Sequence, residues 1–208
     1  VATAIDATDL SAIGAATSGA VTVTNAIAIS GTQAEITAAL VTTDTLVVAA
    51  TATVTSSDAM SVAEANAVDA KTSGVITATL DTGDTASYST LTGTGNAYTV
   101  TVNDAGSTAI TATALSTLGG KTTGTVTVSN AIAISGTQAE VTAALVTTDT
   151  LVVAGSATAT ISDANTTAID ATALSAIGGK TSGAVTVTNA IAISGTQAEI
   201  TAALVTTD

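Results

Sequence analysis

The chain of 208 residues lacks the side chains on which most enzyme chemistry depends. It has no Cys and no His, and its only cations are Lys71, Lys121 and Lys180. Without cysteine, neither disulfides nor thiolate metal sites can form. The lysines stand at matching places in Lys-Thr-Ser-Gly or Lys-Thr-Thr-Gly turns, where a cation suits the C-terminus of a preceding helix. We predict that the protein is not an enzyme and has no catalytic, cofactor-binding or metal-binding residue.

Positive charge is scarce, since three Lys face 16 acidic residues and the net charge is −13. Phosphate neutralisation needs clustered cations, so we predict no nucleic-acid partner, and adhesion to an anionic membrane is equally disfavoured. The negative charge is typical of molecules kept apart by mutual repulsion. No apolar run approaches the roughly 20 residues that a membrane-spanning helix needs, so no membrane span is predicted.

Aromatic side chains are almost missing, because the chain has no Phe or Trp and only Tyr88 and Tyr98. Its hydrophobic share of 46% comes almost wholly from Ala, Val, Ile and Leu. A globular core usually relies on large aromatic rings to fill its centre. A solenoid has a thin core of stacked small side chains, so this composition favours a repeat architecture.

A short helix with a marked start is predicted over residues 33–40. Thr32 and Glu35 have the spacing of a capping box, and Ile36, Ala39 and Leu40 follow on one helical face. Similar pairs recur along the chain at spacings of 29, 29, 23, 24, 29, 30 and 29 residues. The pairs are Thr3/Asp6, Thr32/Glu35, Ser61/Glu64, Asp84/Ser87, Thr108/Thr111, Thr137/Glu140, Thr167/Asp170 and Thr196/Glu199. This period predicts a solenoid.

Long near-copies support the same interpretation. Residues 4–44 return at 109–149, 105 residues later, and at 168–208, 164 residues after the first copy. Two kinds of coil alternate, one with a helix predicted at 168–179 and the other with the helix at 33–40. We expect residues 1–208 to form one solenoid domain, a segment of a longer repetitive protein.

Strand patterns with a period of two lie between the predicted helices. In residues 20–30, Val21, Val23, Ile27 and Ile29 share one face, while threonines and alanines share the other. Equivalent runs are 45–55, 74–80, 97–102, 125–134, 150–161 and 184–193. One strand and one helix per coil of about 29 residues require parallel strands and a right-handed α/β solenoid. An all-β parallel β-helix is the alternative.

Three further sets of polar residues and glycines have competing interpretations. Calcium is an alternative ligand for Asp58, Asp104 and Asp163 and for the nearby pair Asp81 and Asp84. The nonapeptide of calcium-loaded β-rolls is absent, so turn or capping roles are favoured. Residues Asn25, Asn130 and Asn189 form either a buried ladder or corners in left-handed conformation, and we favour the corners. The Gly178-Gly179 pair is predicted to end its helix with a positive φ.

Outward-facing threonines are the one predicted surface that suits a ligand. They are Thr22, Thr24, Thr51, Thr53, Thr55, Thr77, Thr79, Thr99, Thr101, Thr158, Thr160, Thr186 and Thr188. Flat ranks of this kind suit ice binding or glycosylation. Good strand formers on exposed positions are the simpler explanation, which we favour.

Three phrases carry a resemblance to a known family. Residues 61–80 (SVAEANAVDAKTSGVITATL), 91–102 (LTGTGNAYTVTV) and 115–124 (LSTLGGKTTG) are similar to repeats of giant extracellular surface proteins of marine cyanobacteria and other bacterioplankton. The member linked to swimming without flagella is the best known of them. The resemblance implies a very long, extracellular, repetitive protein, and it implies no catalytic residues.

These observations predict a structural protein at the cell surface, a fibre, sheath or surface layer built by end-to-end stacking of coils. An adhesin stalk or an ice- or glycan-binding module is the alternative. Neither end of the chain carries an atypical capping repeat. We therefore expect both ends to be occupied, by more of the same polypeptide or by self-association with another subunit.

Overall fold

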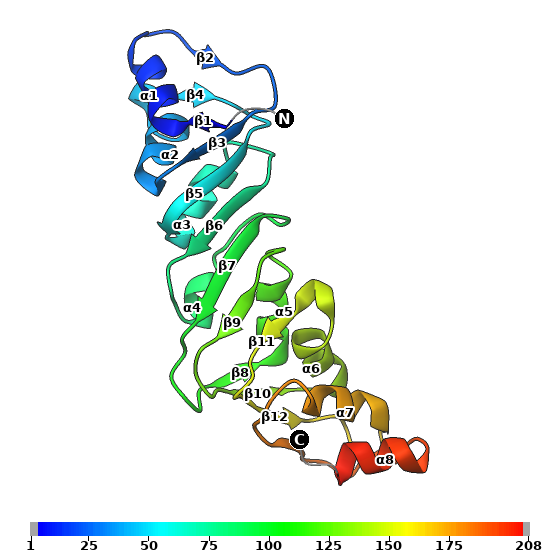
Figure 1. The fold of residues 1–208 in the computed structure, drawn as a ribbon. Coiled ribbons are helices and arrows are strands. Elements are labelled where there is room, and N and C mark those ends of the chain that lie inside the picture. The colour runs from blue at the N-terminus through cyan, green and yellow to red at the C-terminus, as the bar shows by residue number, and fades with distance from the viewer. Residues whose placement is uncertain (1–3, 206–208) are drawn as a thin grey trace. The chain divides into compact units, whose positions relative to one another are not determined.

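The computed structural model describes residues 4–205 and shows an α/β protein in which short strands alternate with short helices (Figure 1). The helices are α1 (Ala7–Ala15), α2 (Gln33–Leu40), α3 (Val62–Asp69), α4 (Thr85–Tyr88), α5 (Ala112–Gly119), α6 (Gln138–Leu145), α7 (Ala171–Gly178) and α8 (Gln197–Leu204), with 3-10 turns η1 (Thr43–Thr45) and η2 (Thr148–Thr150). None of these described helices is long and apolar enough to cross a membrane.

The strands are short, and their pairing is parallel. They are β1 (Ile5–Asp6), β2 (Val21–Thr22), β3 (Ala28–Gly31), β4 (Val47–Val48), β5 (Thr53–Met60), β6 (Ile76–Leu80), β7 (Ala97–Val102), β8 (Ala109–Thr111), β9 (Val126–Val128), β10 (Ala133–Gly136), β11 (Val152–Val153), β12 (Thr158–Ile161), β13 (Ala168–Asp170), β14 (Val185–Val187) and β15 (Ala192–Ser194). The helices in the connections exclude the all-β alternative.

The chain divides into two compact units. Unit 1 comprises Val1–Asp81, Ser87–Val100 and Lys121–Gly124, and unit 2 comprises Thr82–Ala86, Thr101–Gly120 and Thr125–Asp208.

Unit 1 is built on parallel strands paired in the order β1, β3, β5, β6 and β7. Residues Ile5, Ile29, Val54 and Ile76 are register partners on successive strands, and the last three are at most 1% exposed. Helices α1, α2 and α3 pack on these strands and on one another in sequence order. The apolar row is therefore the core, and the opposite face of the sheet is exposed.

Unit 2 repeats this arrangement with strands paired in the order β8, β10, β12 and β14. The register joins Ile110, Ile134, Ala159 and Val185 into one apolar row. Strand pairs β9–β11 and β13–β15 complete the unit, and α5, α6, α7 and α8 pack consecutively. The same alternation of residues in the two units builds the same local layers.

Capping boxes start α2, α3, α6 and α8, as the sequence predicted. At α2 the N–H of Thr32 donates to Glu35 Oε2 at 2.7 Å, and the N–H of Glu35 donates to the Thr32 hydroxyl at 3.4 Å. These reciprocal bonds satisfy N–H groups that the first helical turn leaves without a partner. Threonine or serine followed three positions later by glutamate is therefore a true helix start in this chain.

The other predicted starts are placed too early. The caps of α1, α5 and α7 are Asp6, Thr111 and Asp170 rather than Thr3, Thr108 and Thr167, and Thr3 lies outside the described residues. The predicted helix at 168–179 begins only at Ala171, because residues 168–170 form strand β13. Branched Ile169 pairs with Ile193 on β15, and the strand prevails over the helical pattern there. Caps at 6, 32 and 61 are thus 26 and 29 residues apart, so the even spacing was wrong.

The predicted glycine helix ends are also wrong. Gly120 and Gly179 cap α5 and α7 with φ of −70° and −68°. Within residues 4–205, positive φ at glycine occurs at Gly93, Gly95 and Gly195. Glycine near the helix ends serves close packing instead.

Candidate functional site: contacts between successive repeats

The polar contacts that recur along the chain join each repeat to the preceding one, and the Lys-Thr-x-Gly turns supply the most buried of them. Thr122 is 7% exposed. Its hydroxyl donates to the carbonyl oxygen of Tyr98 at 2.8 Å and accepts the N–H groups of Tyr98 at 2.7 Å and Gly124 at 2.9 Å. The hydroxyl of Thr72 donates to Ala52 O at 2.5 Å in the same way. A threonine that looks like a turn residue in the sequence is a buried connector.

The glycine of this turn lies against the neighbouring main chain. A Cβ atom at Gly74, Gly124 or Gly183 would overlap the carbonyl oxygen of Ala52, Tyr98 or Ala157, respectively. None of the three glycines has a positive φ. Close approach of two backbones therefore requires glycine here.

Sequence reasoning missed a buried amide at Asn96, which is 4% exposed. Its Oδ1 accepts the N–H of Ile76 at 2.8 Å, and its Nδ2 donates to Asp69 Oδ1 at 2.7 Å. Asn96 thereby occupies the edge of β6 where a strand partner would otherwise bond. The Gly-Thr-Gly-Asn stretch reads only as a loop, so no periodic signal identified it.

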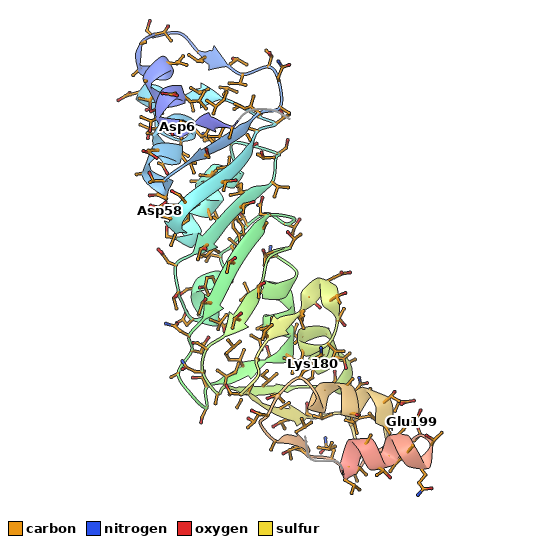
Figure 2. All side chains as sticks on the ribbon, viewed as in Figure 1. Asp6, Asp58, Lys180 and Glu199 are labelled. Carbon is orange, nitrogen blue, oxygen red and sulfur yellow. The ribbon has the colours of Figure 1, made fainter. Side chains whose placement is uncertain are left out.

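The predicted calcium candidates act as caps across repeats. Asp163 Oδ2 accepts the N–H of Gln138 at 2.6 Å, and Asp58 Oδ1 accepts the N–H of Gln33 at 2.5 Å (Figure 2). These are the first residues of α6 and α2, 25 positions earlier in the chain. Asp104 bonds the N–H and hydroxyl of Thr85 at the start of α4, both at 2.7 Å. The capping role favoured from the sequence is what the geometry shows.

The three asparagines are neither a buried ladder nor left-handed corners. Asn25, Asn130 and Asn189 are exposed, and none has a positive φ. Asn130 Nδ2 donates to Asp104 O at 2.8 Å, and Asn189 Nδ2 donates to Asp163 O at 2.7 Å. Both amides therefore bond the corner of the preceding repeat, 26 residues earlier.

The threonine face lies where the alternation predicted it. In unit 1, Thr55 is the register partner of Thr77, and Thr79 is the partner of Thr99; all four are exposed. In unit 2, the register joins Thr111, Ser135, Thr160 and Thr186 across four strands. Neighbouring strands lie about 4.8 Å apart, so each unit carries a short rank of hydroxyls at that spacing. Alanines interrupt it, as where Thr77 pairs with Ala97.

Chemistry-bearing groups do not converge elsewhere in residues 4–205. Three or more His, Cys, Asp or Glu side chains able to share a metal ion are not brought together in this part of the chain. Lys71, Lys121 and Lys180 directly follow the C-caps of α3, α5 and α7, as the turn pattern predicted. They are positioned near helix C-termini, where a cation is favourable.

Hydrogen bonding lowers the pKa of three surface carboxyls. Backbone and side-chain bonds from Thr32 hold the pKa of Glu35 below its usual 4.5, and bonds from Thr137 do the same for Glu140. The Thr172 hydroxyl and N–H lower the pKa of Asp170. Each bond favours the charged form, so each carboxyl ties helix stability to pH.

Acid should weaken the fold through these caps. A lowered folded-state pKa contributes stability above the unfolded value near 4.5, and that contribution is lost as pH falls through the folded value. We expect the urea midpoint to drop between about pH 6 and about pH 3, and to drop less in the Glu35→Gln/Glu140→Gln double variant. Asp44→Asn, which removes charge outside the capping boxes, is the control. An equal drop in the double variant and the parent would contradict the assignment.

Tyr98 and Tyr88 offer a matched test of buried hydroxyls. Tyr98 is fully buried and its hydroxyl has no hydrogen-bond partner; burial, with a smaller contribution from Asp69, raises its pKa. The Tyr88 hydroxyl donates to Asp81 O at 2.7 Å. We expect Tyr88→Phe to lower the free energy of unfolding by about 1 kcal/mol and Tyr98→Phe to leave it unchanged or raise it. Urea denaturation measures both, and a larger loss for Tyr98→Phe would refute the placement of its hydroxyl.

Comparisons with known proteins leave this geometry to stand by itself. No protein-family model matches the chain. No curated protein matches it. No solved structure matches it.

Proposed function

We propose that the chain is a structural repeat segment of an extracellular fibre, sheath or surface layer. In this proposal its strand–helix repeats wind as a right-handed solenoid, and they stack end to end within or between chains. The observation that carries the proposal is that the same contacts recur between successive repeats. Thr72, Thr122 and Thr181 each donate to a carbonyl of the preceding repeat, at Ala52, Tyr98 and Ala157.

Parallel pairing supports the same proposal. Each repeat bonds to the one before it in the same direction and with aligned apolar residues, such as Ile29 with Val54 and Ile134 with Ala159. Contacts of this kind can be added without limit, because each new repeat presents the edge that the next one needs. A protein built in this way acts through its length and surface, as a fibre does. The resemblance of residues 61–80 to repeats of giant surface proteins agrees with an extracellular place.

Imaging tests the proposal. Purified chain, and tandem fusions of it, should appear as elongated rods or filaments by negative-stain electron microscopy. Small-angle scattering should show the radius of gyration growing nearly in proportion to the number of fused copies, as rods require. Compact particles, with a radius of gyration that follows the weak size dependence of globular domains, would contradict it.

The threonine ranks support a second function, an adhesin stalk or a face that binds ice or glycans. Thr55, Thr77, Thr79 and Thr99 line one exposed sheet face in register. A Thr55→Lys/Thr77→Lys variant should lose ice-recrystallisation inhibition or glycan-array binding while its urea midpoint changes little. Thr117→Lys, at an exposed position on α5, is the matched control. Negative assays with the parent chain would remove this alternative.

A further inference from the structure

The sequence holds three copies of one framework but two copies of the segment that packs against it. The framework is residues 4–44, 109–149 and 168–208. The segment Thr-Leu-Val-Val-Ala occurs at 45–49 and 150–154. Comparing the three frameworks shows what the segment does where it is present.

In unit 1 the segment fills a groove between α1, α2 and β2. Val47 pairs with Val21 and is 1% exposed. The Thr45 hydroxyl donates to Ala38 O near the end of α2. The carbonyl oxygen of Thr45 lies so close to Gly14 that a Cβ atom there would overlap it. The segment thus contacts a strand edge, a helix end and a helix glycine.

In unit 2 the second segment makes the same contacts. Val152 pairs with Val126 and is 1% exposed. The Thr150 hydroxyl donates to Ala143 O on α6, and a Cβ atom at Gly119 would overlap Thr150 O. Two independent copies of the groove are therefore filled in one way.

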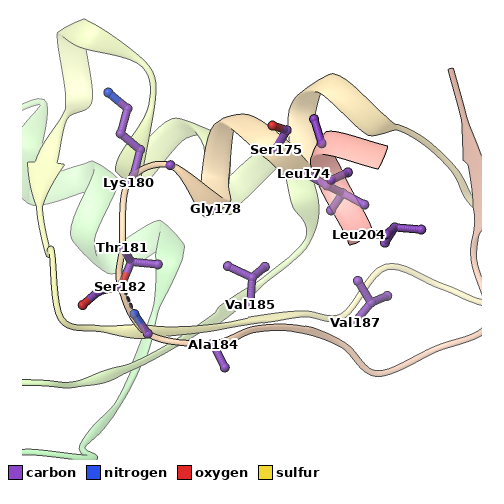
Figure 3. A pocket seen from close by; sticks show the side chains of 14 residues that line it. Leu174, Ser175, Gly178, Lys180, Thr181, Ser182, Ala184, Val185, Val187 and Leu204 are labelled. Carbon is purple, nitrogen blue, oxygen red and sulfur yellow. Dashed lines mark hydrogen bonds between the residues drawn. The ribbon is translucent and has the colours of Figure 1, made fainter. Parts of the chain in front are cut away.

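The third groove, between α7, α8 and β14, is open. It has a volume of about 880 Å³, and Figure 3 shows Val185 and Val187 directed toward Leu174 and Leu204. No atom of residues 4–205 comes within 4 Å of a Cβ atom built at Gly178, the counterpart of Gly14 and Gly119. Leu204 is 59% exposed, whereas its counterparts Leu40 and Leu145 are each 1% exposed.

The free edge of β14 is also ready to pair. The N–H of Thr188 donates to Ile161 O on β12 at 3.1 Å, and β14 pairs with β12 on that side. Alternation along the strand turns the N–H of Val187 to the other edge. Its counterpart Val23 donates to Val48 O on the segment at 2.9 Å. A strand added at this edge would find a donor in the right place.

We propose that the groove of α7, α8 and β14 binds a further Thr-Leu-Val-Val-Ala segment of this protein's own repeat, paired parallel to β14. The inference rests on the proposed function for its meaning, because it names the contact through which end-to-end growth proceeds. The occupant is fixed by precedent, since this sequence fills both equivalent grooves. The small Gly178 and the open carbonyl of Ala202 are the counterparts of the groups that the segment contacts there.

The test lengthens the chain of 208 residues by Thr-Leu-Val-Val-Ala after Asp208. Relative to the chain without the addition, the amide of Val187 should exchange hydrogen roughly tenfold more slowly, and the urea midpoint should rise. An added Thr-Leu-Asp-Asp-Ala, whose carboxylates cannot enter an apolar groove, should produce neither effect. Equal exchange with both additions would overturn the proposal.

A second variant protects the test from failures of folding. Gly178→Ala places a methyl group where the groove is open, so the fold of the chain without the addition should be unchanged. The same methyl group would overlap the threonine carbonyl of an inserted segment, so both effects of the addition should vanish. Gly155→Ala, at another open position, should keep both effects. Slow exchange at Val187 that persists in Gly178→Ala would show that the segment binds elsewhere.

The readouts separate this inference from the proposed function. Protection of Val187 is measured on single lengthened chains, and it stands even if imaging shows no filaments, in which case only the structural function fails. Filaments that form as well with Gly178→Ala as with the parent would support the function and overturn the groove.

Discussion

Replacing Gly124 by alanine is expected to lower the free energy of unfolding by about 3 kcal/mol or more, because the added methyl group overlaps the backbone of the preceding repeat. The contact is with the carbonyl oxygen of Tyr98, which belongs to strand β7 and cannot rotate away as a side chain can. Moving this backbone also disturbs the bonds of the Thr122 hydroxyl to Tyr98 and Gly124, at 2.7–2.9 Å. Urea denaturation of the purified variant measures the loss.

Gly155→Ala is the matched control for this experiment. A Cβ atom at Gly155 meets no described atom within 4 Å, and its φ is not in the left-handed region. The chain itself carries Ala50 at the equivalent position, 105 residues earlier. We expect Gly155→Ala to stabilise by about 0.4–1 kcal/mol, because alanine restricts the unfolded chain. If the two variants unfold at the same urea concentration, close backbone approach is not what glycine provides in the Lys-Thr-x-Gly turn.

The sequence allowed prediction of the layers, because alternation and capping are local signals. Val126, Val128, Ile132 and Ile134 share one parity in the sequence and are all buried in the structure. The capping boxes were found because Thr or Ser followed by Glu three positions later satisfies its own helix start. These features depend on residues a few positions apart, and a single sequence displays them directly.

Contacts between repeats were not predictable in the same way. The pairing of Asp163 with the N–H of Gln138 joins residues 25 positions apart, and nothing near Asp163 marks it as a helix cap. Asn96 is buried because it bonds Ile76 and Asp69, which no local pattern reveals. Helix starts such as Ala171 were misplaced because a strand pairing formed elsewhere in the sequence took the preceding residues.

The end of unit 2 provides the other large expected effect, in a pair of leucines that differ in burial alone. Leu145 and Leu204 occupy the same position of the repeated stretch Gln-Ala-Glu-(Val/Ile)-Thr-Ala-Ala-Leu, at the ends of α6 and α8. Leu145 is 1% exposed and Leu204 is 59% exposed. We expect Leu145→Ala to cost about 2–5 kcal/mol of the free energy of unfolding, because it leaves a cavity in a packed layer. Leu204→Ala should change it by less than about 0.5 kcal/mol.

Protein concentration turns this comparison into a test of what covers α8. If chains remain separate, the small effect of Leu204→Ala is the same in dilute and concentrated solution. If another chain docks on α8, binding stabilises the folded parent by mass action, and the cost of Leu204→Ala grows with concentration. The cost of Leu145→Ala should stay constant, because its contacts lie within the chain. A large, concentration-independent cost at Leu204 would mean that residues of the same chain already bury it.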